Sequence, residues 1–173
     1  DGIRDTSVTG VQTCALPILV PTLLNENHEI YIVSRKPISK LKLDLDFNKL
    51  KFFQIDLSKE KSWNNENFLN ILRDTDGIIN LMGEPIAEKK WTSAQKEEIK
   101  NSRIKTTKLM MKTLKNFKIN PKVIINGSAI GYYGTSLSVE FTENSNGGKD
   151  FLANLCKQWE AVAAEKPFFS RLV

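Results

Sequence analysis

Hydroxyl-bearing side chains gather in one glycine-rich stretch, GSAIGYYG at residues 127–134. Ser128 follows an apolar run typical of a strand, and Tyr132 and Tyr133 come next, between glycines. Such hydroxyls can orient a substrate oxygen or relay its proton, so these three residues are candidates for catalysis on a carbonyl or alcohol. A turn with packing tyrosines is the alternative, and the residues alone leave both open.

Polar residues follow two other strand-like runs. The first run ends in Ser34-Arg35-Lys36. An acid at such a place suits the ribose hydroxyl of a dinucleotide, whereas Arg suits a 2′-phosphate because its fork matches phosphate geometry. The second run ends in Asp56-Leu57, where the acid can cap the next element or accept a bond from an adenine amino group. Ordinary surface cations and a simple cap are the alternatives.

A glycine follows the third run, GIINLM at residues 77–82. Gly83 lacks a side chain, so the backbone there could approach a ligand closely; a plain turn is the alternative. The three runs and a fourth at residues 122–126 read as strands, and the run at 77–82 is apolar enough for burial on both faces.

Helix-like pieces separate these strands. They are residues 19–25, where Pro21 marks the first turn, 65–73, one long helix over 93–117, and a helix capped by Asp150. Residues 127–148 are predicted to be loop, and 168–173 to begin another strand. This alternation predicts an α/β fold with a doubly wound parallel sheet of the Rossmann type, in which ligands bind at the carboxyl ends of the strands.

Composition excludes several classes of protein. The 173 residues carry a net charge of +5, but the lysines are scattered, which favours a solvated surface over a nucleic-acid partner. One His and two Cys cannot assemble a zinc site or a disulfide framework, so we expect no metal and a reducing compartment such as the cytoplasm. No apolar stretch is long enough to cross a membrane.

The first 18 residues have a different character from the rest. DGIRDTSVTGVQTCALPI resembles a sequencing adapter translated in one frame, and it shows no convincing periodicity. We therefore expect residues 1–18 to be non-native and residues 19–173 to form a partial domain. Where a dinucleotide-binding sheet has its first strand and glycine-rich turn, this chain has Val8-Thr9-Gly10, with Thr13 and Leu16 at the next glycine positions. The central strand is expected to be lost.

Five motifs occur in an order and spacing that resemble one family. They are NLMGEPIAEKKWT at residues 80–92, SRIKTT at 102–107, SAIGYYG at 128–134, FTE at 141–143 and DFLANLCKQWEAVA at 150–163. Over residues 19–173 the chain is similar to the NAD(P)-dependent epimerase/dehydratase-like group of the extended short-chain dehydrogenase/reductase superfamily, once labelled cell-division-inhibitor-like. The chain would then be a fragment of such a protein, ending before the substrate-binding portion.

The resemblance implies a site. It places Ser34, Arg35 and Lys36 near the adenosine phosphate of NADP, with NAD the less favoured cofactor. It places Asp56 and Leu57 near the adenine, and Leu81, Met82 and Gly83 along the ribose and pyrophosphate. Ser128 falls at the superfamily's catalytic Ser/Thr position, and Tyr132 and Tyr133 fall beside the substrate.

One departure from the superfamily leaves the function open. The usual catalytic Tyr, with a Lys four residues later, is absent from the helix that begins FLANL at residues 151–155. The favoured hypothesis is an NADP-dependent oxidoreductase or epimerase acting on a small, sugar-like substrate, with Ser128 and a nearby Tyr handling the proton. The alternative is a module that binds NADPH as a structural or sensory ligand without catalysis. This exact polypeptide is expected to be inactive.

Overall fold

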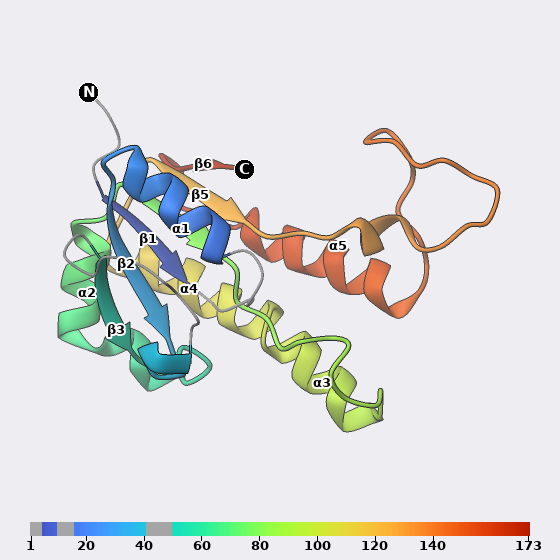
Figure 1. Ribbon diagram of the computed structural model, residues 1–173, viewed down its shortest axis with the longest axis horizontal. Helices are drawn as coiled ribbons and strands as arrows, with labels where there is room; N and C mark the ends of the chain where they lie inside the picture. The colour runs from blue at the N-terminus through green and yellow to red at the C-terminus, as the bar shows by residue number, and fades with distance from the viewer. Residues whose placement is uncertain (1–4, 10–15, 41–49) are drawn as a thin grey trace.

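A parallel β-sheet forms the centre of the computed structural model, which describes residues 5–9, 16–40 and 50–173. Its six strands are β1 (Asp5–Thr9), β2 (Glu29–Ser34), β3 (Leu50–Gln54), β4 (Gly77–Asn80), β5 (Val123–Asn126) and β6 (Arg171–Leu172). Their order is β3-β2-β1-β4-β5-β6, so the chain winds outward from β1 in both directions (Figure 1). The predicted doubly wound parallel sheet is confirmed.

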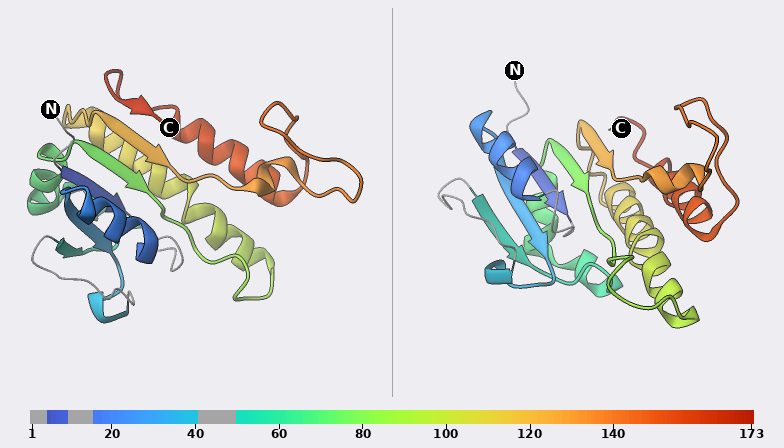
Figure 2. Two further views of the ribbon diagram at one scale, coloured as in Figure 1. Left: turned by 45° about the horizontal axis from the view of Figure 1, so that its top comes forward. Right: turned by 45° about the vertical axis from the view of Figure 1, so that its right-hand side comes forward.

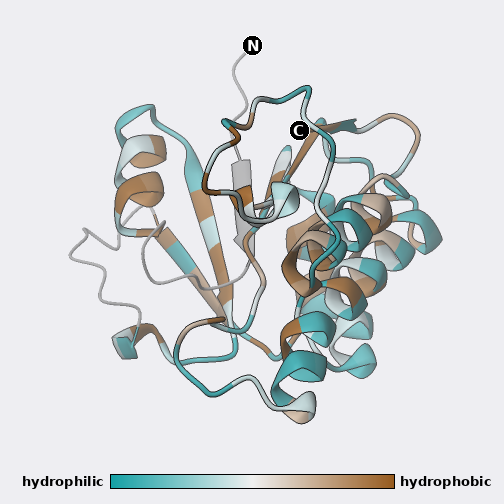
Figure 3. Ribbon diagram, turned by 90° about the vertical axis from the view of Figure 1, so that its right-hand side faces the viewer, coloured by the Kyte–Doolittle hydropathy of each residue, from teal (hydrophilic) through white to brown (hydrophobic). Residues whose placement is uncertain are grey.

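Helices cover both faces of this sheet (Figures 1 and 3). The helices are α1 (Leu16–Asn25) on one face, and α2 (Glu66–Arg73), α4 (Ile104–Asn116) and α5 (Phe151–Ala163) on the other, with α3 (Ser93–Asn101) leading into α4. Because successive strand residues point to opposite faces, Ile78 and Ile79 enter different hydrophobic clusters. All four β4 residues are buried, as the sequence predicts.

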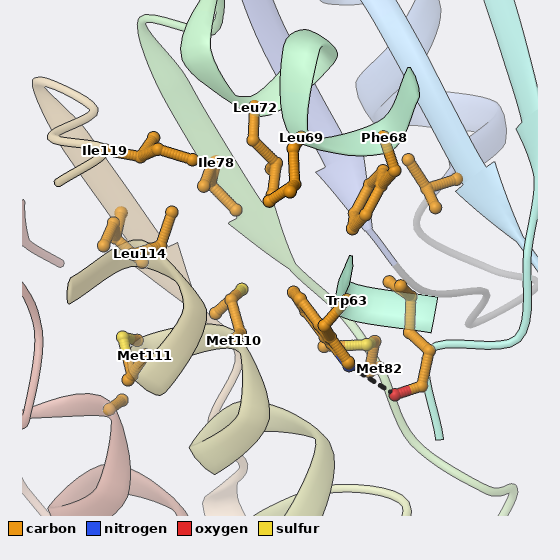
Figure 4. Close-up of a cluster of buried hydrophobic side chains, with 14 residues drawn as sticks. Trp63, Phe68, Leu69, Leu72, Ile78, Met82, Met110, Met111, Leu114 and Ile119 are labelled. Carbon is orange, nitrogen blue, oxygen red and sulfur yellow. Dashed lines mark hydrogen bonds between the residues drawn. The ribbon is translucent and has the colours of Figure 1, made fainter. Parts of the chain in front are cut away.

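The larger cluster lies between the sheet, α2 and α4 (Figure 4). Phe68 is fully buried in this cluster, with its ring stacked on Phe53 at 5.8 Å and edge-on to Trp63 at 5.6 Å. The Trp63 indole N–H donates to the carbonyl of Leu57 at 2.9 Å. The cluster therefore fixes the chain directly after β3, where one wall of the candidate site begins.

Side-chain caps start the helices where the sequence indicates. The Asn65 side chain accepts a bond from the backbone N–H of Phe68 at 3.0 Å, and Asp150 accepts one from Ala153 at 2.8 Å. Each cap satisfies a backbone donor that the first helical turn leaves without a partner. The predicted start of α5 is confirmed.

The single helix predicted over residues 93–117 is wrong, because α3 and α4 are separated by a turn at Ser102 and Arg103. The Ser102 hydroxyl donates to the carbonyl of Ile99, and the buried Arg103 side chain donates to the same carbonyl. These bonds satisfy the end of α3 from within the turn. Apolar periodicity continues through both helices and therefore conceals the break. The stretch predicted as loop also contains a 3₁₀ turn at Ile130–Tyr133, called η4.

The beginning of the chain also differs from expectation. Helix α1 spans the boundary expected after residue 18, and Pro21 lies inside it, since burial of Leu16 and Val20 stabilises the preceding turn. β1 fills the central position of the sheet, paired with β2 and β4, so the expectation of a lost central strand does not hold for the backbone. Of the residues at the glycine-loop position, Gly10 and Thr13 lie outside the described residues, whereas Leu16 is the first residue of α1.

Replacing Phe68 by Ala should lower the free energy of unfolding by about 3–5 kcal/mol, since it removes a fully buried ring and leaves a cavity. Phe168→Ala is the matched control. That ring is 89% exposed, so its loss should cost less than about 0.5 kcal/mol. Urea unfolding of the two variants measures both values, and equal losses would contradict this description of the core.

Candidate functional site

A pocket of about 790 Å³ opens at the carboxyl ends of β2, β3 and β4. Its walls are residues 33–36 after β2, 55–58 after β3, 82–89 after β4, and Glu98, Asn101, Ser102, Lys105 and Thr106 from α3 and α4. This is the edge where doubly wound sheets bind ligands. Four cations (Arg35, Lys36, Lys89, Lys105) and four carboxylates (Asp56, Glu84, Glu88, Glu98) line it.

Most residues predicted to hold a cofactor meet in this pocket. Ser34, Arg35, Lys36, Asp56, Leu57, Met82 and Gly83 all line it. Leu81 does not, because strand alternation turns its side chain toward the α1 side of the sheet. The pocket therefore gathers three separate segments of the sequence, and Leu81 can contribute through its backbone alone.

Arg35 is engaged by an acid that the sequence does not single out. Its Nη2 donates to Oε2 of Glu84 at 2.9 Å, and Nζ of Lys89 donates to the other carboxylate oxygen at 2.9 Å. The Glu84 side chain is buried and that of Arg35 is half-exposed. The bond from Lys89, aided by Arg35 and opposed by burial, holds the pKa of Glu84 below its ordinary value, so this carboxylate stays ionised.

Asp56 has local partners. One carboxylate oxygen accepts from the backbone N–H and the hydroxyl of Ser58 at 3.1 and 2.7 Å, and the other lies 3.4 Å from Nζ of Lys59. Burial raises the pKa of Asp56, but these bonds outweigh it and the pKa falls below its usual value. The carboxylate thus forms a local turn with Ser58 and does not cap the next element, since the 3₁₀ turn at Glu60–Asn64 begins without a side-chain cap. The contact of Asp56 with adenine stays a prediction.

A neighbouring side chain explains why position 83 is a glycine. A β-carbon added there would lie 2.7 Å from the guanidinium carbon of Arg103. Arg103 is buried, and its Nη1 donates to the carbonyls of Glu84 at 3.0 Å and Ile99 at 3.2 Å. The glycine is therefore required by a side chain of the protein itself, whereas the sequence suggested a ligand or a plain turn.

A buried polar network lies between the pocket and α5. The Asn80 amide donates to Thr107 Oγ1 at 2.9 Å and to Asn126 Oδ1 at 2.7 Å. The indole N–H of Trp159 donates to the same Thr107 hydroxyl at 2.9 Å. The network joins β4, β5, α4 and α5. The sequence did not predict it, because each partner taken singly is an ordinary polar residue.

The predicted catalytic residues lie apart from this pocket, along α5. The hydroxyl of Ser128 donates to Oε1 of Glu160 on that helix. Tyr132 and Tyr133 pack edge to face at 5.2 Å, and Tyr133 stacks on Phe141 at 5.6 Å. None of the three lines the pocket, so they form a second group on the β5 side of the site.

One contact between a lysine and an aromatic ring and one between two aromatic rings involve residues of α5 beside this second group. Nζ of Lys157 lies 5.9 Å from the Tyr132 ring and donates to the carbonyl of Gly148 at 2.6 Å. Phe151, near the place where the superfamily has its Tyr, packs edge-on against Trp91 at 5.7 Å. Glu160 and Lys157 both come from the motif at residues 150–163, which was the available signal for them.

Among the described residues, no helix is long and apolar enough to span a membrane. Within the same ranges, no three His, Cys, Asp or Glu side chains gather in a cluster that could hold a metal ion.

Comparison with known proteins identifies the family that this chain matches. The model of the NAD dependent epimerase/dehydratase family matches residues 7–152, which is most of the chain. The chain belongs to this family. An epimerase family protein of Arabidopsis thaliana, described as a chloroplastic SDR39U1 homolog, is 36% identical over 159 residues, covering 91% of this chain.

Solved structures agree on the fold of this family member. The human epimerase family protein SDR39U1, solved with NADPH, is 25% identical, with a TM-score of 0.70 over 98% of this chain. WbmG of Bordetella bronchiseptica, solved with NAD and UDP, is 12% identical with a TM-score of 0.74 over 96% of this chain, a likeness that shows the fold alone. The chain spans 43% of the Arabidopsis protein and 52% of the human chain.

Gly83→Ala should lower the free energy of unfolding by about 1–3 kcal/mol, because the added methyl displaces the guanidinium of Arg103 and both of its bonds. Gly131→Ala is the control, since its β-carbon would meet Leu152 at an ordinary 3.4 Å. The same Gly83 change in an Arg103→Ala background should cost less, and additive losses in that double-mutant cycle would show that the two sites are independent.

Proposed function

We propose that the complete protein is an NADP-dependent oxidoreductase or epimerase that acts on a small, sugar-like alcohol or carbonyl substrate. The observation that carries the proposal is the position of Arg35 and Lys36 at the end of β2, on the wall of the pocket. An acid at this position would suit NAD, whereas two cations suit the extra phosphate of NADP. The human relative solved with NADPH supports the same choice.

The residues present fit the adenosine end of the cofactor. Arg35, Lys36 and the turn at Ser34 would hold the phosphate, and Asp56 with Leu57 would meet the adenine. Backbone after β4, at residues 81–83, would run along the ribose and pyrophosphate. The bound nicotinamide would supply hydride transfer, and the protein would supply position and proton handling.

Ser128 and Glu160 would handle the proton. The single hydroxyl hydrogen of Ser128 is donated to the Glu160 carboxylate, so the Ser128 oxygen is left to accept a bond from a substrate hydroxyl. A proton leaving that hydroxyl could pass to Ser128 Oγ while the Ser128 proton passes to Glu160. Tyr132, beside Lys157, is the second candidate donor on the same side of the site.

A binding module without catalysis is the second candidate. The observation that favours it is Phe151, whose ring packs against Trp91 and has the Lys96 ammonium 5.5 Å away, and which carries no phenol to relay a proton. Such a module would hold NADPH as a structural or sensory ligand.

NADPH should raise the melting temperature of the complete protein under either function. Under the enzymatic one, a panel of sugars and small alcohols should yield turnover, with kcat falling about a hundredfold in Ser128→Ala and Glu160→Gln. Ser138→Ala, on the exposed loop after η4, is the control and should leave kcat unchanged. Binding without turnover on any substrate would favour the module, and turnover unaffected by Ser128→Ala would remove Ser128 from the mechanism.

We also propose that residues 1–18 derive from an adapter and replace a native strand and glycine loop. The pairing of β1 is consistent with either origin, because ladder bonds use backbone groups that any extended segment offers. Sequencing the source DNA across the codon for Leu19 from an outside primer should reveal an apolar strand followed by spaced glycines. Confirmation of codons for Asp1 to Ile18 would refute the adapter origin. The chain would then have no glycine-rich phosphate loop at this place.

We also propose a reducing compartment such as the cytoplasm, because the one cysteine among the described residues is not in a disulfide. Cys156 is a free, buried thiol, and burial raises its pKa, which keeps it protonated and unreactive.

A further inference from the structure

Glu84 is an anion whose position the fold fixes. Its backbone N–H donates to the Ser102 hydroxyl at 2.8 Å, and its carbonyl accepts from Arg103 at 3.0 Å. The side chain is buried, while the side chains of Arg35 and Lys89 are about half exposed. The fold therefore fixes the position of the carboxylate, and the two more exposed cations reach it from the pocket wall.

Two anions would consequently bind Arg35, the Glu84 carboxylate and the 2′-phosphate. The carboxylate already holds Nη2, and the proposed function assigns the same guanidinium to the 2′-phosphate of NADP. A guanidinium can serve both partners through its other N–H groups, but the phosphate must then approach a fixed negative charge. Lys89, which also lines the pocket, is engaged in the same way by the other carboxylate oxygen.

We propose that Glu84 is a specificity-determining residue that competes with the 2′-phosphate for Arg35 and Lys89 and so weakens binding of NADPH more than binding of NADH. The inference rests on the proposed function, since it takes the pocket to be the dinucleotide site. NADH lacks the 2′-phosphate and leaves both ion pairs intact. NADPH carries an additional charge of about −1.5 to −2 at neutral pH and must share or break them.

The balance of charge in the pocket supports this competition. The cations and carboxylates that line it are equal in number, so the pocket offers a phosphate little net attraction. Neutralising Glu84 would leave an excess positive charge and release two side chains at once. Neutralising another lining carboxylate would change the charge without releasing either cation.

Glu84→Gln in the complete protein should tighten NADPH binding by about threefold to tenfold, with NADH changed less than about twofold, as expected for the loss of two ion pairs whose cations are about half exposed. Nicotinamide fluorescence measures both dissociation constants. The tightening should shrink as salt rises. Glu88→Gln is the matched control because it removes the same charge from the same loop, and no described ion pair joins Glu88 to Arg35 or Lys89.

Lys89→Met tests the idea without touching a buried group. It leaves Glu84 to Arg35 alone, so NADPH binding should weaken selectively, while Lys90→Met, which removes a charge outside the pocket lining, should have a smaller effect. An unchanged or weaker NADPH affinity in Glu84→Gln, or equal gains for NADPH and NADH, would overturn the inference alone. A wild-type protein that binds neither dinucleotide would overturn the proposed function itself, whatever the variants do.

Discussion

The buried guanidinium of Arg103 is the constraint on which the candidate site depends. A buried cation is tolerated only when its donors find acceptors, and here these are the carbonyls of Glu84 and Ile99. The guanidinium also lies 5.5 Å from the ring of Trp159. These contacts require a glycine at position 83, end α3 before α4 begins, and hold the chain after β4 against α4 and α5. One buried charge therefore holds in place the wall of the pocket that follows β4.

Sequence reasoning recovered the parts of the structure that local patterns encode. The runs that became β2 and β4 are β-branched and apolar, and Asp150 is a cap of an ordinary kind, so the order of elements and the edge of the sheet where the pocket lies could be predicted. Glu84 as the partner of Arg35 could not, because 49 positions separate the two side chains. The turn at Ser102 also escaped, since the amphipathic period continues across it.

The two groups of candidate residues differ in how they are held. The pocket residues follow short strands whose ends the ladder fixes, so a motif placed after a strand predicts their neighbourhood well. Ser128 and the two tyrosines follow β5 on a longer segment that runs along α5 (Figure 2). Their contacts depend on which residues of α5 face that segment, and Glu160 and Lys157 are fixed by helix rotation, which strand patterns do not report.

The position of β1 has a consequence for motion. β2 and β4 each pair with β1 and not with each other, so β1 is the seam between two halves of the sheet (Figure 1). Arg35 follows β2 on one half and Glu84 follows β4 on the other, and their ion pair crosses that seam at its carboxyl end. Local opening at β1 would therefore draw Arg35 and Glu84 apart, so the width of the pocket is tied to backbone pairing at the centre of the sheet rather than to a loop at its rim.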